Sequence, residues 1–186
     1  MAKIKNKVLA EIIDLLKLVV ITFAVVFSIS TFVLRPVQVD GTSMFPLLHD
    51  NDVGFANILN RTINGIKRFD IVVIYIPERN EYLVKRVIGL PGETVEYRND
   101  VLYINGQPVA EDFFIDSYIQ EYKTNNPGKF FTDNFGPVVV GEDEYFVMGD
   151  NRPGSADSRY YGAYKGSQLI ASGIIILWPV DHMLIR

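Results

Sequence analysis

The stretch "FDIVVIYIPERNEYLVKRVIGL", Phe69–Leu90, contains two segments that predict neighbouring β-strands. The first, Phe69–Pro77, is a run of β-branched residues that is apolar on both faces, which is typical of a strand buried on both sides. The second, Glu81–Leu90, ends at the turn signal Pro91-Gly92. The sequence therefore predicts two consecutive strands near the middle of the chain.

Further short strands on both sides of this pair make the outer part of the chain mainly β. Apolar runs recur at Glu144–Asp150 and Ala171–Val180, and Asn105-Gly106 between two apolar runs predicts a two-residue β-hairpin. Many short strands with closely spaced turns indicate a β-sandwich or a partly open β-barrel. Residues 111–137 are polar, aromatic and rich in Asn, Gly and Pro, and we expect a small excursion from the β-core, either a lid or a plain surface loop.

The N-terminal part predicts one membrane anchor. Residues 18–34, "LVVITFAVVFSISTFVL", carry no charge and approach the length that spans a hydrocarbon core. The run is apolar all round, unlike a core helix, and lacks the small-x-small exit of a cleaved signal peptide. Lysines concentrate before it, so the positive-inside rule predicts a cytoplasmic segment 1–17 and an extracytoplasmic domain 36–186. For Trp178 we favour a packed strand end over contact with the bilayer surface.

Composition excludes several classes of protein. The chain has 186 residues, 48% of them hydrophobic, and a formal net charge of −4, which argues against a nucleic-acid-binding protein. It contains no cysteine, so disulfides, thiolate catalysis and cysteine-based zinc sites are excluded. His49 and His182 are the only histidines, and neither has a clustered acidic partner in the sequence. We therefore expect no Ser-His-Asp triad, no metal site and no cofactor.

One hydroxyl and one amine are candidates for catalysis. Ser43 follows the anchor closely in the Gly- and Pro-punctuated segment "VDGTSMFPLL". Lys85 shares a strand face with the apolar Leu83 and Val87, so it is expected to lose hydration, and its pKa is expected to fall. A lysine that is neutral near physiological pH can act as a general base, and Ser-Lys pairs are a known variant of the catalytic triad. The plain alternatives are a turn serine and an edge-strand lysine.

Four segments, taken in order, resemble type I signal peptidases, and their arrangement is closest to the bacterial, Gram-positive-like members with a Ser-Lys dyad. These segments are "GTSMFPLL" around Ser43, "RFDIVVIYIP", "YLVKRVIGLPGETV" around Lys85, and "GDNRPGSADSRYYG" at residues 149–162. Each block is short and weak by itself. The resemblance is specific because all four blocks occur in the family's order behind an N-terminal anchor. Together the blocks cover most of the chain outside residues 107–140.

The resemblance implies a role for each matching residue. Ser43 would be the nucleophile and Lys85 the general base, while Ser155 would hydrogen-bond the lysine amine. Asp157 would pair with Arg159 and hold its loop in place. Met44 would pack near the nucleophile, and Asp150 and Arg152 would be structural. Some relatives carry a serine two residues before the nucleophile, but this chain has Gly41 there, so the oxyanion would depend on backbone N–H groups such as that of Ser43.

The implied function is the removal of signal peptides from exported preproteins through an acyl-enzyme, at the outer surface of the cell membrane. The expected partners are therefore preproteins and the lipid bilayer, without nucleic acid or metal. Two alternatives stay open: a non-catalytic, membrane-tethered β-domain that acts as a binding module, and a membrane Ser-Lys protease of broader specificity. A self-cleaving repressor-type peptidase is disfavoured, because that class would carry a DNA-binding helix-turn-helix at the position where this chain has its anchor.

Overall fold

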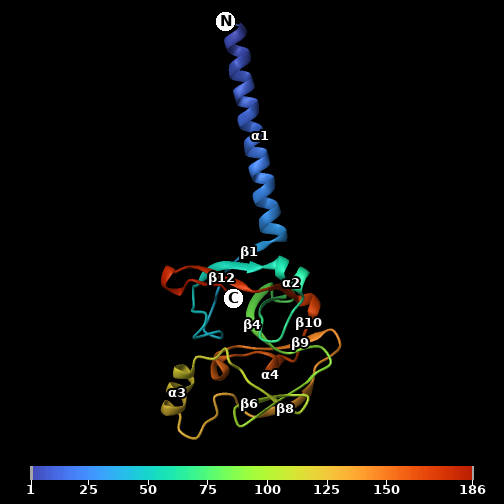
Figure 1. The fold of residues 1–186 in the computed structure, drawn as a ribbon, viewed down its shortest axis with the longest axis vertical. Coiled ribbons are helices and arrows are strands. Elements are labelled where there is room, and N and C mark those ends of the chain that lie inside the picture. The colour runs from blue at the N-terminus through green and yellow to red at the C-terminus, as the bar shows by residue number, and fades with distance from the viewer. Residues whose placement is uncertain (1, 186) are drawn as a thin grey trace.

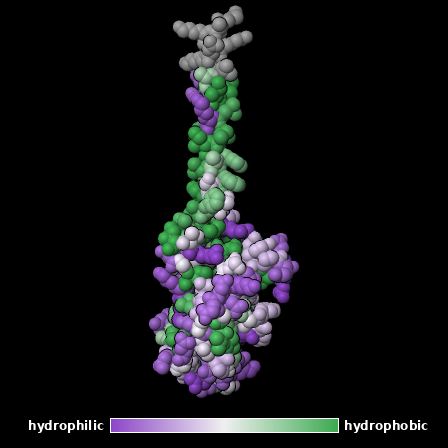
Figure 2. Space-filling view, turned by 90° about the vertical axis from the view of Figure 1, so that its right-hand side faces the viewer, coloured by the Kyte–Doolittle hydropathy of each residue, from purple (hydrophilic) through white to green (hydrophobic). Residues whose placement is uncertain are grey.

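A computed structural model describes the backbone of residues 2–185 and the side chains of residues 10–185. One long helix, α1 (Ala2–Phe32), projects from a β-domain that contains the remainder of the described chain (Figure 1). From Ala10 to Phe32 this helix is long and apolar enough to cross a membrane. Its described side chains are exposed, and Figure 2 shows them as an apolar stalk above a largely polar domain.

The helix boundaries differ from the predicted anchor at 18–34. The backbone from Ala2 onward already belongs to α1, so residues 2–17 are a helical extension of the apolar segment. The helix ends at Phe32 because Leu34 begins strand β1 (Leu34–Gln38), whose Pro36 has no N–H to continue a helix. The helical segment that could span a membrane, Ala10–Phe32, therefore begins and ends closer to the N-terminus than the predicted anchor at 18–34.

Three antiparallel sheets form the domain. The five-stranded sheet follows the order β10-β9-β4-β3-β11, and the two four-stranded sheets follow the orders β1-β2-β12-β13 and β7-β6-β5-β8. The sheet next to α1 in Figure 1 contains β1, β2 (Val53–Asn57), β12 (Ile174–Trp178) and β13 (Leu184–Ile185). The central sheet contains β3 (Ile71–Ile76), β4 (Glu81–Gly89), β9 (Glu144–Met148), β10 (Tyr164–Lys165) and β11 (Leu169–Ser172). The sheet far from α1 contains β5 (Thr94–Arg98), β6 (Val101–Ile104), β7 (Gln107–Val109) and β8 (Phe135–Val139).

The prediction of a mainly β domain behind one apolar helix is confirmed. The two strands of the opening stretch, β3 and β4, pair in antiparallel register, and the Asn105-Gly106 hairpin joins β6 to β7. Short helices connect the strands: α2 (Ile58–Asn64), α3 (Asp116–Asn125), α4 (Ser158–Tyr161), η1 (Arg152–Gly154), η2 (Gly166–Gln168) and η3 (Val180–His182). The predicted excursion at 111–137 contains α3 and ends within β8.

The apolar run at 171–180 was expected to be one strand, and this expectation is wrong. The run divides at Gly173 into the end of β11 and the whole of β12, which belong to different sheets. Gly173 has φ of 88°, a conformation that other residues rarely adopt, and this turns the chain from one sheet to the next. The turn places Ile174 and Ile176 in a buried cluster with Met44, beneath the segment that carries Ser43.

Candidate active site

The segment that carries Ser43 is a closed loop packed onto the domain. We call residues 39–52 the nucleophile loop. The backbone N–H groups of Val39 and Asn51 bond the carbonyls of Asp52 and Val39, at 2.8 and 2.9 Å, and close its base. Met44 is buried among apolar residues and anchors the loop next to Ser43. The buried Met44 and the backbone bonds at the base of the loop thus hold the segment that carries Ser43 in place.

Lys85 lies opposite Ser43 on strand β4. Its side chain is only 3% exposed, so it is not a solvated edge lysine. The Lys85 Nζ atom is 2.7 Å from Ser43 Oγ and 3.2 Å from the carbonyl oxygen of Val84. Burial lowers the pKa of Lys85, and this effect outweighs the opposing influence of the Asp157, Glu81 and Asp150 carboxylates. The pair therefore combines hydrogen-bond distance with an amine whose neutral form is favoured.

Asp157 and Arg159 hold the loop at residues 149–162. The Arg159 guanidinium donates to Asp157 Oδ1 and Oδ2 at 2.8 and 2.9 Å, and the N–H of Gly149 donates to Asp157 Oδ2 at 3.0 Å. Burial favours the neutral carboxyl group, but the bonds and charge of Arg159 and the Gly149 N–H outweigh it and keep the pKa of Asp157 below its usual value. The loop is thereby tied to the end of β9.

Gly149 permits the close approach of two loops. A Cβ atom at this position would lie 2.3 Å from both Ser155 Oγ and the Ser43 carbonyl oxygen. Only a residue without a side chain fits there. Ser155 is buried, but among the residues described its Oγ has no hydrogen-bond partner, and the expected bond to Lys85 is not formed in this conformation.

The serine and the lysine line one end of a groove of about 770 Å³. Within residues 2–185, β1 on one wall pairs only with β2, and the Glu81–Lys85 part of β4 on the other wall pairs only with β3. Each wall therefore presents a strand edge to the groove. Ser30 and Thr31 at the end of α1 also line the groove, so it extends from the apolar helix to the dyad.

The comparisons with known proteins identify the family. A sequence model for "Signal peptidase, peptidase S26" matches residues 12–178. The chain belongs to this family. The chain is 39% identical over 182 residues to a signal peptidase I of Bacillus amyloliquefaciens, with 97% of this chain and 96% of the relative covered. It is 42% identical over 174 residues to a signal peptidase I of Bacillus licheniformis, covering 93% and 92% of the two chains.

Among solved structures, a signal peptidase I from Enterococcus faecalis is 41% identical, with a TM-score of 0.49, and the match covers 57% of this chain and 95% of that one. The predicted membership in the signal peptidase family and the prediction of an enzyme, a peptidase, are confirmed. A non-catalytic β-domain is therefore no longer a good description of the chain.

Two further residues of this signal peptidase family member contact the nucleophile loop and had no predicted role. The Asn151 N–H donates to the Ser43 carbonyl at 3.0 Å, and its side-chain amide donates to the Thr42 carbonyl at 3.1 Å. Tyr118 on α3 donates its hydroxyl to Asn151 Oδ1 at 3.0 Å, and its ring packs edge-on against Phe45. The sequence indicates Asn151 only as part of a polar loop. Nothing in its spacing connects Tyr118 to Ser43.

Asp150 and Arg152 were predicted to be structural in the signal peptidase pattern, and their surroundings agree with that role. Asp150 accepts two hydrogen bonds from the buried Arg86 at 2.7 and 2.6 Å. Arg152 is fully enclosed and pairs with Glu111 and Tyr97. Both charges are thus compensated by partners inside the domain.

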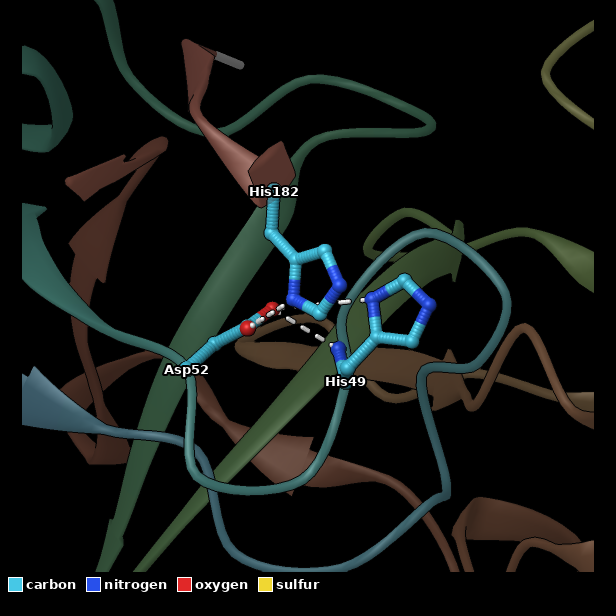
Figure 3. A group of neighbouring side chains, drawn as sticks. All are labelled: His49, Asp52 and His182. Carbon is cyan, nitrogen blue, oxygen red and sulfur yellow. Dashed lines mark hydrogen bonds and ion pairs between the residues drawn. The ribbon is translucent and has the colours of Figure 1, made fainter. Parts of the chain in front are cut away.

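The expectation that the histidines have no acidic partner is wrong. His49 and His182 lie next to one another with their rings stacked, and Asp52 lies beside both, so that the ligand atoms of the three side chains fall within 4.8 Å of one another (Figure 3). The sequence separates His182 from Asp52 by most of the chain, so no local pattern could reveal this group.

Proposed function

We propose that this chain is a membrane-anchored serine endopeptidase that removes N-terminal signal peptides from exported preproteins. The observation that carries the proposal is the buried Lys85 amine, with its lowered pKa, at 2.7 Å from Ser43 Oγ. Membership in the signal peptidase family and relatives named signal peptidase I support the choice of substrate.

In the proposed mechanism the neutral Lys85 amine takes the proton of Ser43 as Oγ attacks the scissile carbonyl carbon. The C–N bond then breaks, the proton passes to the leaving amine, and the mature protein departs. The signal peptide stays attached to Ser43 as an ester. Lys85 next deprotonates a water molecule, which hydrolyses the ester and regenerates both side chains.

The oxyanion would be stabilised by the backbone N–H of Ser43. Among the described residues this N–H has no hydrogen-bond acceptor, whereas the N–H of Gly41 already bonds Asp50 Oδ1 at 2.8 Å. Ser155, whose buried Oγ has no partner among the described residues, is proposed to orient the lysine amine after a small side-chain rotation. Asp157 and Arg159 would keep Ser155 in place.

The groove supports an extended substrate. A peptide lying between β1 and the Glu81–Lys85 edge of β4 could pair with free backbone groups as an added strand. Because the groove reaches the end of α1, a cleavage site just outside the bilayer would meet the dyad. The lysines before the apolar run favour a cytoplasmic N-terminus and an extracytoplasmic domain.

The direct test is cleavage of a preprotein by the purified full-length chain in detergent or vesicles. Ser43→Ala and Lys85→Ala should each lower kcat/KM by at least about 10²-fold, the usual contribution of such a group. The wild-type rate should rise with pH as Lys85 loses its proton, at a pH below that of an ordinary lysine. Ser167→Ala and Lys67→Ala change exposed residues of the same types and should cleave normally.

Unchanged cleavage by Lys85→Ala, or a rate that does not depend on its titration, would overturn the dyad. Profiling of substrates separates the proposal from a protease of broader specificity. Signal-peptide removal requires cleavage confined to small-x-small sites near the outer membrane surface, whereas a broad protease would also cut internal sites of folded or unfolded proteins.

A further inference from the structure

A group of three side chains that could ligate a metal lies apart from the residues that line the groove. His49 and Asp52 come from the end of that loop, and His182 comes from the C-terminal turn η3 (Figure 3). His182 Nδ1 is 2.8 Å from Asp52 Oδ1, and His49 Nδ1 is 3.9 Å from Asp52 Oδ2. The three side chains thus converge although they belong to opposite ends of the β-domain sequence.

The donor atoms match the preferences of borderline transition metals. Two imidazole nitrogens and one carboxylate oxygen form a common three-ligand set for Zn²⁺, which accepts solvent as its fourth ligand. The Asp52 carboxylate is only 1% exposed and also accepts the backbone N–H of His49 at 2.8 Å, which fixes its direction. His49 Nδ1 is buried and has no hydrogen-bond partner among the described residues. A buried nitrogen lone pair beside a fixed carboxylate is a position that an ion would satisfy.

The arrangement must adjust by a ring rotation before an ion can bind. The two imidazole rings are stacked, with centroids 4.0 Å apart and an interplanar angle of 19°. A metal ion lies in the plane of each ligating ring, so it cannot meet both rings while they are stacked. The His49 side chain is 36% exposed and can turn about its Cβ–Cγ bond. The ion would also replace the proton between His182 and Asp52, as metal binding to imidazole requires.

We propose that His49, Asp52 and His182 form a binding site for a transition-metal dication such as Zn²⁺, which links the nucleophile loop to the C-terminal turn. His49 packs edge-on against Phe45, which lies close to Ser43 in this loop. An ion held at this position joins two segments that the described structure connects here by the bond of His182 to Asp52. The site is distinct from the serine and lysine, and it stands whether or not they are catalytic.

The chain is well suited to a clean binding test, because it has no cysteine and only these two histidines. Full-length protein without an affinity tag is titrated with Zn²⁺ by calorimetry at pH 7.5, and Co²⁺ is added separately to record its visible absorption. We expect one equivalent of Zn²⁺, tetrahedral-type Co²⁺ bands and a rise in thermal midpoint, because only the folded chain brings the ligands together.

His49→Gln and His182→Gln should each weaken Zn²⁺ binding at least tenfold. Asp133→Asn is the matched control: it removes an exposed carboxylate outside the cluster, and it should bind as the wild type does. Equal loss in Asp133→Asn, or full binding by the double glutamine variant, would show only non-specific attraction and overturn the site.

A measurement on the wild-type chain tests the site without substitutions, so it remains informative if the variants fail to fold. With two histidines, imidazole proton resonances are few enough to assign, and one equivalent of Zn²⁺ should shift those of both rings together. A shift of one ring only, or of neither up to millimolar Zn²⁺, would contradict the proposal.

Discussion

At the residue scale, the site depends on one amine that is kept out of water. Lys85 is buried on β4 of the central sheet, and the described carboxylates that influence its pKa form no ion pair with its amine. The same burial that favours the proposed role as a general base is unfavourable for folding at low pH, because the charged amine loses hydration. The proposed catalytic role of Lys85 and the stability of the domain therefore oppose one another.

This opposition predicts how stability depends on pH. The pKa of Lys85 is lowered in the folded protein, so between that pKa and about 10.4 the unfolded chain binds more protons than the folded chain. The free energy of unfolding of the wild type should therefore rise with pH across this window, relative to Lys85→Met. At lower pH the methionine variant should be the more stable of the two. Thermal midpoints of both proteins in one detergent, measured at several pH values, test this.

A matched pair makes the comparison specific. Lys67 is exposed, so Lys67→Met should show the same pH dependence as the wild type. Parallel stability curves for the wild type and Lys85→Met would mean that Lys85 titrates as an ordinary solvated lysine.

At the scale of elements, the excursion at 111–137 supports the nucleophile loop from outside the β-core. Helix α3 contributes Tyr118, which reaches Ser43 through Asn151 and packs on Phe45. Phe131, also in this excursion, is buried and packs against Tyr118 and Tyr122. These contacts indicate a brace for the loop, and they favour neither a freely moving lid nor a plain surface loop.

Tyr118→Phe removes the hydroxyl of this brace and keeps its ring. One hydrogen bond contributes about 0.5–1.5 kcal/mol, so kcat/KM for a preprotein should fall by about 2- to 10-fold, while the thermal midpoint changes little. Tyr122→Phe alters a neighbouring tyrosine on α3 whose hydroxyl makes no hydrogen bond to another described residue, and it serves as the control. If both variants cleave at the same rate, α3 does not position the loop through this bond.

At the scale of the whole molecule, the sheet nearest to α1 in Figure 1 carries exposed apolar side chains at and after the end of β12. Trp178 is 63% exposed at the end of β12, which corrects the expectation of a packed strand end. The residues after it add exposed apolar side chains, namely Val180, Met183 and Ile185. Tryptophan favours the interface between lipid and water, so this edge of the domain is expected to rest on the bilayer beside the anchor.

Trp178 is the only tryptophan, so its fluorescence reports on this edge directly. In vesicles that contain brominated lipids, we expect blue-shifted emission from Trp178 and strong quenching by bromines placed near the headgroups. The control is the double variant Trp178→Phe/Val139→Trp, which moves the probe to an exposed position on β8, far from α1 in Figure 1. If the brominated lipids do not quench the emission of Trp178, contact between Trp178 and the bilayer surface is excluded.

The sequence by itself determined the apolar helix and most of the strands, and it indicated Ser43 and Lys85 as the candidate dyad, because these follow from local hydrophobic period, turn residues and short motifs. Tertiary structure alone decided the division of the 171–180 run between two sheets, the groove between β1 and β4, the brace from Tyr118, and the meeting of His182 with Asp52. The physical reason is that each of these contacts joins segments distant in the chain. Such contacts depend on how the sheets turn and pack, which no local pattern encodes.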